Sequence, residues 1–207
     1  MQIAIIEYNA GNVQSVLFAL ERLGLRAALT KDPAQIRAAD RVIFPGVGEA
    51  STTMAYLREH GLDELIRSLR QPVLGICLGM QLLCEHSEEN DTPCLGIIPQ
   101  RVRRFQPQAG EKVPHMGWNS IRQLKNGLFS PELEGAYAYF VHSYYVETGP
   151  YTTATTDYIH PFSAGLQKDN FYAAQFHPEK SGLMGEQLLM NFLFGSEIGG
   201  RAIGNGQ

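Results

Sequence analysis

The sequence predicts one α/β domain with three layers, in which helices cover both faces of a mostly parallel or mixed central sheet. In the first half, apolar runs typical of buried strands alternate with segments whose apolar residues recur at helical spacing. From about residue 95 to residue 176, short β-rich runs replace this alternation. A chain of 207 residues can bury one substantial core and is short for two, so we expect a single domain over residues 1–207.

The first pair of elements sets the pattern. The run "QIAIIEY" at 2–8 is almost continuously apolar, which predicts a buried strand, and "AGNVQSVLFALERLG" at 10–24 predicts a helix that ends at Gly24. The expected elements that follow are strands at 26–30, 41–46 and 72–76, a short segment opened by Asp32-Pro33, and a helical stretch at about 51–70 broken near Gly61. Such alternation favours a parallel sheet covered on both faces.

The second half is expected to be rich in short β runs and to end in a helix. Runs such as "AYAYFVHSYYVE" and "YTTATTDY" have the composition of strands. The stretch "GLMGEQLLMNFLFG" at 182–195 predicts a helix that packs its Leu, Met and Phe residues inward. We find no repeat, low-complexity tract or linker that would divide the chain.

Composition argues against several classes of protein. A net charge of -4 provides no basic surface for nucleic acid, and the one dense basic cluster, "RVRRF", has strand-like spacing. The opening "MQIAIIEY" lacks the cationic start of an export signal, and no apolar run approaches the length that crosses a bilayer. Three cysteines, an odd number, do not suggest a disulfide framework. We therefore expect a soluble protein of a reducing cytoplasm.

The most informative stretch is Gly75-Ile76-Cys77-Leu78-Gly79, where the expected strand turns into a helix. This G-x-C-x-G pattern is the thiol counterpart of the nucleophile elbow. Side chains at 75 and 79 would collide across so sharp a turn, so both positions need to lack a β-carbon. The start of the helix favours the thiolate, and the Leu78 amide can donate to an oxyanion. The alternative is that Cys77 only fills the core and that the glycines allow close packing.

A thiol nucleophile needs a base, and "YAAQFHPEKS" at 172–181 offers one. The run is strand-like and ends in His177-Pro178-Glu179. Residues i and i+2 of an extended segment share one side, so Glu179 can bind one imidazole nitrogen while the other faces Cys77. Alone, a histidine at a strand end is more often a surface or core residue. Together with the elbow it favours a triad in the order Cys, His, Glu.

A metal site is the other common use of cysteine and histidine. No pair of these residues has the close spacing of a zinc site, and Cys77, Cys84 and Cys94 have no CxxC partner. Neither a phosphate-binding glycine loop nor a dinucleotide fingerprint is found. The sequence therefore predicts neither a metal nor a cofactor.

The segments "GICLGMQLL" and "QFHPEKS" resemble the class I, triad-type glutamine amidotransferases, whose glutaminase domain uses Cys, His and Glu to release ammonia from glutamine. Four further motifs narrow the resemblance: "YNAGNVQSV", "FPGVGEA" at 44–50, "VPHMGWN" at 113–119 and "FVHSYY" at 140–145. Over essentially the whole chain they resemble the glutaminase subunits of imidazole glycerol phosphate synthases, from histidine biosynthesis. The Pro45-Gly46-Val47-Gly48 strand supports this branch, because other members usually carry a Gly-Gly-Pro-Gly type sequence there.

The resemblance implies a role for each matching residue. Cys77 would attack the glutamine side-chain amide to form a thioester, His177 would protonate the departing ammonia and then activate water, and Glu179 would orient the imidazole. The amides of Val47 and Leu78 would hold the oxyanion, and in this branch the Val47 N–H is thought to point away at rest. The implied glutamine-recognition residues are Gly46, Gln81, Glu89, Ser143 and Tyr144. Structural alternatives are a solvated acidic turn around Glu89 and a core position for Tyr144.

The resemblance also implies a partner, because we see no second domain that would receive the ammonia. In the family the acceptor is a (β/α)8-barrel cyclase subunit, which joins ammonia to a phosphoribulosyl-formimino ribotide and forms imidazole glycerol phosphate and aminoimidazole carboxamide ribotide. Asn12, Pro114, Met116 and Trp118 lie in segments that the family uses at this interface. Trp118, the only tryptophan, could serve equally as an interface hot spot or as a core anchor.

Two rival interpretations stay open. One is a glutaminase of another synthase, such as that for pyridoxal phosphate, or a cysteine-dependent hydrolase of related fold; the "PHMGWN" and PGVG segments argue against it. The other is a non-catalytic binding module that has kept the fold, against which the intact set of Cys77, His177 and Glu179 argues.

Overall fold

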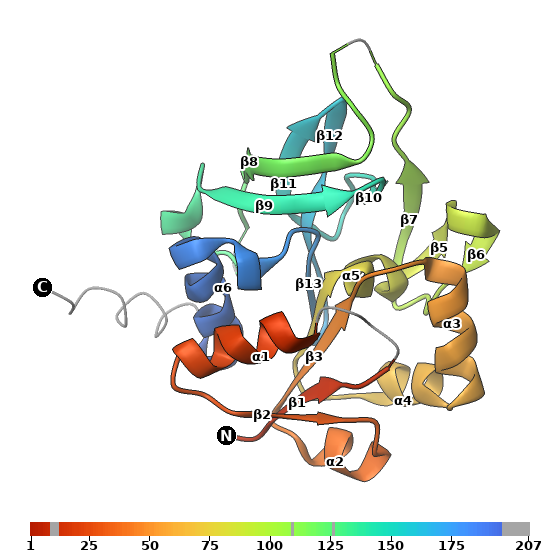
Figure 1. Ribbon diagram of the computed structural model, residues 1–207, viewed down its shortest axis with the longest axis vertical. Coiled ribbons are helices and arrows are strands. Elements are labelled where there is room, and N and C mark those ends of the chain that lie inside the picture. The colour runs from red at the N-terminus through yellow and green to blue at the C-terminus, as the bar shows by residue number, and fades with distance from the viewer. Residues whose placement is uncertain (9–12, 109, 126, 196–207) are drawn as a thin grey trace, which may run out of the picture.

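The computed structural model describes residues 1–8, 13–108, 110–125 and 127–195. Within this part of the chain the main sheet has 11 strands in the order β2-β1-β3-β4-β13-β12-β10-β7-β5-β6, with β11 paired to β12 (Figure 1). Five consecutive strands of this sheet pair in parallel: β1 (Ile3–Ile6), β2 (Ala27–Thr30), β3 (Arg41–Gly46), β4 (Val73–Cys77) and β13 (Phe171–Ala174). The predicted mixed central sheet is confirmed.

The second half of the chain is β-rich, as predicted, and most of its strands extend the main sheet. The added strands are β5 (Cys84–Ser87), β6 (Thr92–Pro93), β7 (Ile98–Arg104), β10 (Tyr144–Val146), β11 (Thr152–Tyr158) and β12 (His160–Lys168). A separate two-stranded sheet forms from β8 (His115–Ser120) and β9 (Tyr137–His142). The His177 N–H donates to the Tyr139 carbonyl at 3.0 Å, so this small sheet adjoins the segment that follows β13.

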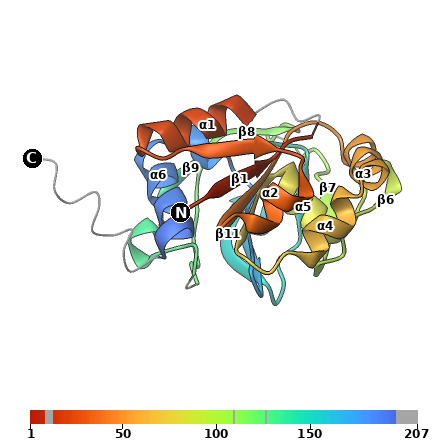
Figure 2. The same ribbon diagram turned by 90° about the horizontal axis from the view of Figure 1, so that it is seen from below.

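Helices cover both faces of the main sheet (Figure 2). They are α1 (Val13–Arg22) and α6 (Gly182–Phe194) on one face, and α2 (Pro33–Ala38), α3 (Ala50–Glu59), α4 (Leu62–Ser68) and α5 (Leu78–Leu83) on the other. Alternate residues of β1 enter the two cores: Ile3 and Ile5 pack with α1 and α6, whereas Ala4 and Ile6 pack with the other four helices. The expected three layers are confirmed.

The helix boundaries follow the sequence signals. The stretch predicted at 51–70 forms α3 and α4, separated at Gly61, whose φ of 65° suits glycine. The helix expected at 10–24 is observed as α1 and ends at Arg22, while residues 10–12 lie outside the described residues. In the part of the chain that the structure describes, no helix has the length and apolar character to cross a membrane.

Three neighbouring parallel strands bring the sequence motifs to one edge of the sheet. β3 and β4 pair so that Gly46 lies opposite Cys77, and β13 lies on the other side of β4. The carboxyl ends of parallel strands open at the same edge, which is where α/β proteins commonly bind ligands. The elbow, the PGVG strand and the His-Pro-Glu segment therefore meet there.

Candidate active site

Cys77 lies at the junction of β4 and α5 with φ 54° and ψ −111°, a conformation that few non-glycine residues adopt. Its neighbouring glycines make the junction possible. A β-carbon on Gly75 would lie 3.0 Å from the backbone C and O of Gly79, and one on Gly79 would lie 2.0 Å from the carbonyl oxygen of Phe44 in β3. The predicted need for two glycines is confirmed, although Gly79 is restricted mainly by β3 rather than by the elbow itself.

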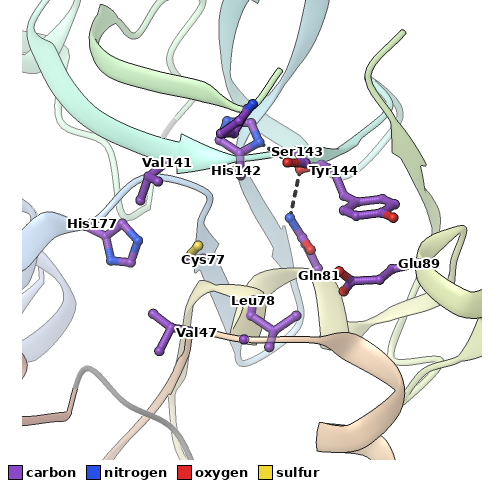
Figure 3. A pocket seen from close by; sticks show the side chains of 12 residues that line it. Val47, Cys77, Leu78, Gln81, Glu89, Val141, His142, Ser143, Tyr144 and His177 are labelled. Atoms are coloured by element: carbon purple, nitrogen blue, oxygen red, sulfur yellow. Dashed lines mark hydrogen bonds between the residues drawn. The ribbon is translucent and has the colours of Figure 1, made fainter. Parts of the chain in front are cut away.

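The predicted triad residues come together beside this elbow. His177 Nδ1 and Glu179 Oε1 are 2.7 Å apart, and the two residues are only 1% and 7% exposed. Since the carboxylate accepts, Nδ1 carries the proton and Nε2 is left for the opposite side. Nε2 is buried without a regular hydrogen bond to the described residues, and Figure 3 shows the imidazole facing the same space as the Cys77 sulfur.

The local geometry of the His–Glu pair differs from the expected extended segment. β13 ends at Ala174, and Pro178–Lys180 form a single 3-10 turn, η3. Pro178 begins this turn because its fixed φ suits a first helical position. Glu179 therefore reaches back to His177 across a turn rather than along a strand. The extended geometry was wrong, whereas the predicted hydrogen bond is confirmed.

The surroundings of His177 hold its imidazole in the charged form. Burial alone lowers the pKa of His177, but the Cys77 side chain and then the Glu179 carboxylate outweigh burial and raise this pKa to about 10. An imidazole that is protonated at neutral pH favours a thiolate on the neighbouring cysteine. The pair can thus supply a nucleophile and a proton donor at the same site.

A cavity of about 360 Å³ opens over the Cys77 sulfur (Figure 3). Its volume lies near the lower end of ligand pockets in general, which span about 300 to 1,000 Å³. The lining residues are Val47, Gly48, Cys77, Leu78, Gln81, Glu89, Pro114, Val141, His142, Ser143, Tyr144 and His177. The predicted oxyanion residues and most of the predicted glutamine-recognition residues therefore border one space.

Gly46 lies behind the cavity wall rather than in it. A β-carbon at this position would be 2.6 Å from the Tyr8 hydroxyl and 2.7 Å from the Gly79 nitrogen. The Tyr8 hydroxyl donates to the carbonyl of Pro45, and burial, together with the nearby Cys77, raises the pKa of Tyr8. Position 46 is thus a close contact between the PGVG strand and the elbow.

Glu89 is half-buried at the far side of the cavity from His177 (Figure 3). Its Oε2 accepts from the Ala50 N–H at the start of α3, at 2.7 Å. Burial raises the pKa of the Glu89 carboxyl and Glu49 adds to this rise, while the Ala50 hydrogen bond opposes it. The turn around Glu89 is largely exposed, as the alternative of a solvated acidic turn expects, but the Glu89 side chain itself is half-buried and bound to the start of α3.

Sequence analysis did not single out His142 and Gln175, two buried polar residues that contact the site. The Tyr144 carbonyl accepts from His142 Nδ1 at 2.7 Å and from Gln81 Nε2 at 2.9 Å (Figure 3). Gln81 Nε2 also donates to Gln175 Oε1 at 2.9 Å. His142 precedes Tyr144, and Gln175 precedes His177, by two positions. For His142, the period of two in extended chain is a signal that could have identified it. Gln175 lies in a bend after β13 has ended at Ala174, and no such signal marks it.

His115 and His142 form a buried, uncharged pair. Because His142 Nδ1 donates to the Tyr144 carbonyl, its Nε2 accepts from His115 Nδ1 at 3.2 Å. Burial lowers the pKa of His142 to about 3, with the charges of His115 and His177 adding to it and the Tyr144 hydrogen bond opposing it. Burial also lowers the pKa of His115 to about 4.

The predicted interface residues divide between the cavity and the surface. Pro114 lines the cavity, whereas Met116 and Trp118 on β8 are 63% and 56% exposed. Trp118 packs edge-on against Tyr139 of β9, with ring centroids 5.9 Å apart. The core-anchor alternative for Trp118 is therefore wrong. Asn12 lies outside the described residues.

Comparisons with known sequences agree with this site. The family model for glutamine amidotransferase class-I matches residues 4–195. The imidazole glycerol phosphate synthase subunit HisH of Bacteroides fragilis is 60% identical over 194 residues, which cover 93% of this chain and 99% of that protein. The subunit of the same name from Idiomarina loihiensis is 47% identical over 193 residues, which cover 93% of this chain and 97% of that protein.

Solved structures share the fold at much lower identity. A crystal structure of a glutamine amidotransferase matches with a TM-score of 0.70 and 21% identity, covering 95% of this chain and 98% of that one. The structure of PurLQS from Thermotoga maritima matches with a TM-score of 0.68 and 16% identity, covering 93% of this chain and 97% of that one. At these identities the likeness shows the α/β fold alone.

Because His115 and His142 are buried in their neutral forms, we expect the free energy of unfolding to fall as the pH is lowered. The folded pKa values of about 4 for His115 and about 3 for His142 lie below the unfolded value of about 6.5. The unfolded chain therefore binds more protons as the pH falls below about 6.5. Each histidine should remove roughly 1–2 kcal/mol from the free energy of unfolding between about pH 6.5 and pH 5, as measured by urea unfolding at both values.

The His115→Gln variant removes one of the titrating groups. Whatever its stability at neutral pH, it should lose less stability on acidification than the wild type. His60→Gln, which changes an exposed histidine, is the matched control and should lose as much as the wild type. If acidification lowers the free energy of unfolding of His115→Gln as much as that of the wild type, the histidine pair is not what makes the fold sensitive to acid.

Proposed function

The chain belongs to the class-I glutamine amidotransferase family, and from this premise we propose that it is the glutaminase subunit of an imidazole glycerol phosphate synthase. It hydrolyses glutamine to glutamate and ammonia for histidine biosynthesis. The observation that carries the proposal is the meeting of Cys77, His177 and Glu179 beside a cavity bordered by predicted glutamine-recognition residues. Unpaired, buried cysteines fit a reducing cytoplasm.

The reaction proceeds through a thioester. The Cys77 thiolate attacks the side-chain carbonyl carbon of glutamine, and the imidazolium of His177 gives its proton to the departing nitrogen, which leaves as ammonia. His177, now neutral, takes a proton from water as the water attacks the thioester, which releases glutamate and restores the thiolate. Glu179 holds Nδ1 and so keeps Nε2 directed at the reacting atoms.

Two backbone amides stabilise the oxyanion that forms on the carbonyl oxygen. Leu78 follows the nucleophile directly, and Val47 follows Gly46, which lies opposite Cys77 in the β3–β4 pairing. Both residues border the cavity. Once both N–H groups point at this position, they stabilise the transition state more than the substrate.

Glutamine recognition uses the opposite end of the cavity. Glu89 Oε1 neutralises the substrate ammonium. Gln81 Nε2 donates to the Tyr144 carbonyl and to Gln175 Oε1, so the Gln81 side-chain oxygen is the atom that can accept from the substrate. Ser143 and Tyr144 form the facing wall, while Gly46 shapes the site from behind.

The ammonia passes to a (β/α)8-barrel cyclase subunit, which makes imidazole glycerol phosphate and aminoimidazole carboxamide ribotide. The exposed Met116 and Trp118 supply apolar surface for docking, and Pro114 connects that surface to the cavity. Large, exposed apolar side chains beside one another are typical of an interface. Asn12, outside the described residues, is expected in the same interface.

The Cys77→Ser variant tests the glutaminase. It should fold and bind glutamine but lose turnover by several orders of magnitude, because serine supplies no thiolate. Added ammonium salt should restore product formation by the complex of this variant with the cyclase, since the acceptor site is untouched. Glutamate release and cyclase product are measured separately.

Cys84→Ser is the matched control, because it replaces another buried cysteine, one whose thiol donates to the Met80 carbonyl. It should keep its turnover. Glutamate release by Cys77→Ser within about tenfold of the wild type would contradict the assignment of the nucleophile. Failure of the ammonium rescue in an intact complex would contradict ammonia supply as the only task of this chain.

The Val47→Pro variant tests control by the partner. We expect the chain alone to be a weak glutaminase that the cyclase and its nucleotide ligand activate by turning the Val47 amide into the oxyanion hole. One such donor is worth about 10²- to 10³-fold in rate. Val47→Pro removes the N–H, so the ratio of ligand-stimulated to unstimulated glutamate release should fall close to one.

Val47→Ala keeps the amide and should retain the stimulation. Equal complex formation by both variants is confirmed first. If Val47→Pro is stimulated as strongly as the wild type, activation does not act through this amide.

A further inference from the structure

Gln175 is fully buried between the nucleophile and the cavity wall. It follows β13, is 0% exposed, and its Nε2 lies 3.8 Å from the Cys77 sulfur, within hydrogen-bond distance for sulfur. Its Oε1 accepts from Gln81 Nε2 at 2.9 Å. Both ends of the amide are therefore engaged, one of them by the nucleophile.

The surrounding contacts determine which end of the amide meets the sulfur. A backbone carbonyl can only accept, so the atom of Gln81 that lies 2.9 Å from the Tyr144 carbonyl must be its nitrogen. The same nitrogen faces Gln175, which must therefore present its oxygen. The NH2 group of Gln175 is then left to face Cys77. A reversed amide would bring two donors together at Gln81 and lose that contact, and its oxygen would repel a thiolate at Cys77.

The Tyr144 carbonyl is itself held in place. It also accepts from His142 Nδ1 at 2.7 Å, and His142 accepts in turn from His115. Asn119 Nδ2 lies 3.4 Å from His115 Nε2, which continues the same donor direction toward β8. The orientation of Gln175 thus follows from a continuous set of hydrogen bonds rather than from one contact.

We propose that Gln175 is a positioning residue that stabilises the thiolate of Cys77 by donating an N–H to its sulfur, in an orientation set by Gln81 and the Tyr144 carbonyl. The inference rests on the proposed function for the identity of the nucleophile. A thiolate is a stronger acceptor than a thiol, so a fixed donor favours the charged form. In a buried site, where water cannot replace the donor, this preference is strengthened.

The test is the alkylation of Cys77 by iodoacetamide in the full-length chain, followed over a range of pH by site-resolved mass spectrometry. Only the thiolate reacts. In Gln175→Met, which has similar size but no donor, alkylation on the acid side of the pH profile should be about tenfold slower, as expected for the loss of a hydrogen bond to a charged group. The difference should disappear at high pH, where the thiol ionises without help.

Further variants separate this effect from damage to the fold. Gln187→Met removes another buried glutamine, which bonds Asn191 in α6, and should leave the pH profile unchanged. If Gln81 acts through Gln175, the Gln81→Met/Gln175→Met double variant should react no more slowly than Gln175→Met alone. Gln175→Leu replaces Gln175→Met if the latter does not fold.

A pH profile of the Gln175 variant equal to that of the wild type would overturn the proposal. Slowing by the same factor at every pH would also overturn it, since that result indicates altered access rather than a lost donor. The readout needs no glutamine. A shifted profile, together with no glutaminase activity of the chain in its complex with the cyclase and ligand, would therefore contradict the proposed function while supporting the role of Gln175.

Discussion

The close approach of the Cys77 turn to β3 is the constraint on which the rest of the site depends. Gly79 lies so near the Phe44 carbonyl that a β-carbon would be 2.0 Å from its oxygen. This approach lets the chain pass from β4 into α5 with an unusual backbone conformation at Cys77, and it places the PGVG segment beside the Cys77 side chain. Because β13 lies on the other side of β4, the same edge also receives His177. Packing of glycine against backbone thus determines where the chemistry can occur.

Polarity in the site is organised around a second backbone group, the Tyr144 carbonyl. It fixes the tautomer of His142 and the orientation of the Gln81 amide, and both side chains border the cavity. The His142 imidazole contributes no positive charge near neutral pH, because burial lowers its pKa to about 3. His177 therefore supplies the positive charge beside the sulfur. The small β8–β9 sheet carries His142 at one end of β9 and the exposed Trp118 on β8, so one element contacts both the cavity and the proposed docking surface.

The sequence predicted the parallel half of the fold and the meeting of Cys77, His177 and Glu179, because both depend on local signals. Apolar runs alternate with helical segments, and glycine or proline marks each functional turn. It did not predict the separate β8–β9 sheet, since its pairing joins segments far apart in the chain. The 3-10 turn at Pro178 was missed because the strand-like pattern gives no sign of where β13 ends. Gln175 was missed because only folding brings it to the sulfur.

The central claim is that Cys77 is a reactive thiolate aimed at a glutamine-sized cavity. Covalent labelling of the chain with a glutamine-like diazoketone tests it most directly, read by intact mass and by mapping of the modified residue. Burial raises the pKa of the Cys94 thiol to about 11 and also raises that of Cys84, so neither should compete. The account predicts a single adduct, on Cys77, whose formation glutamine slows. Labelling on Cys84 or Cys94, or no labelling of the folded chain, would contradict it.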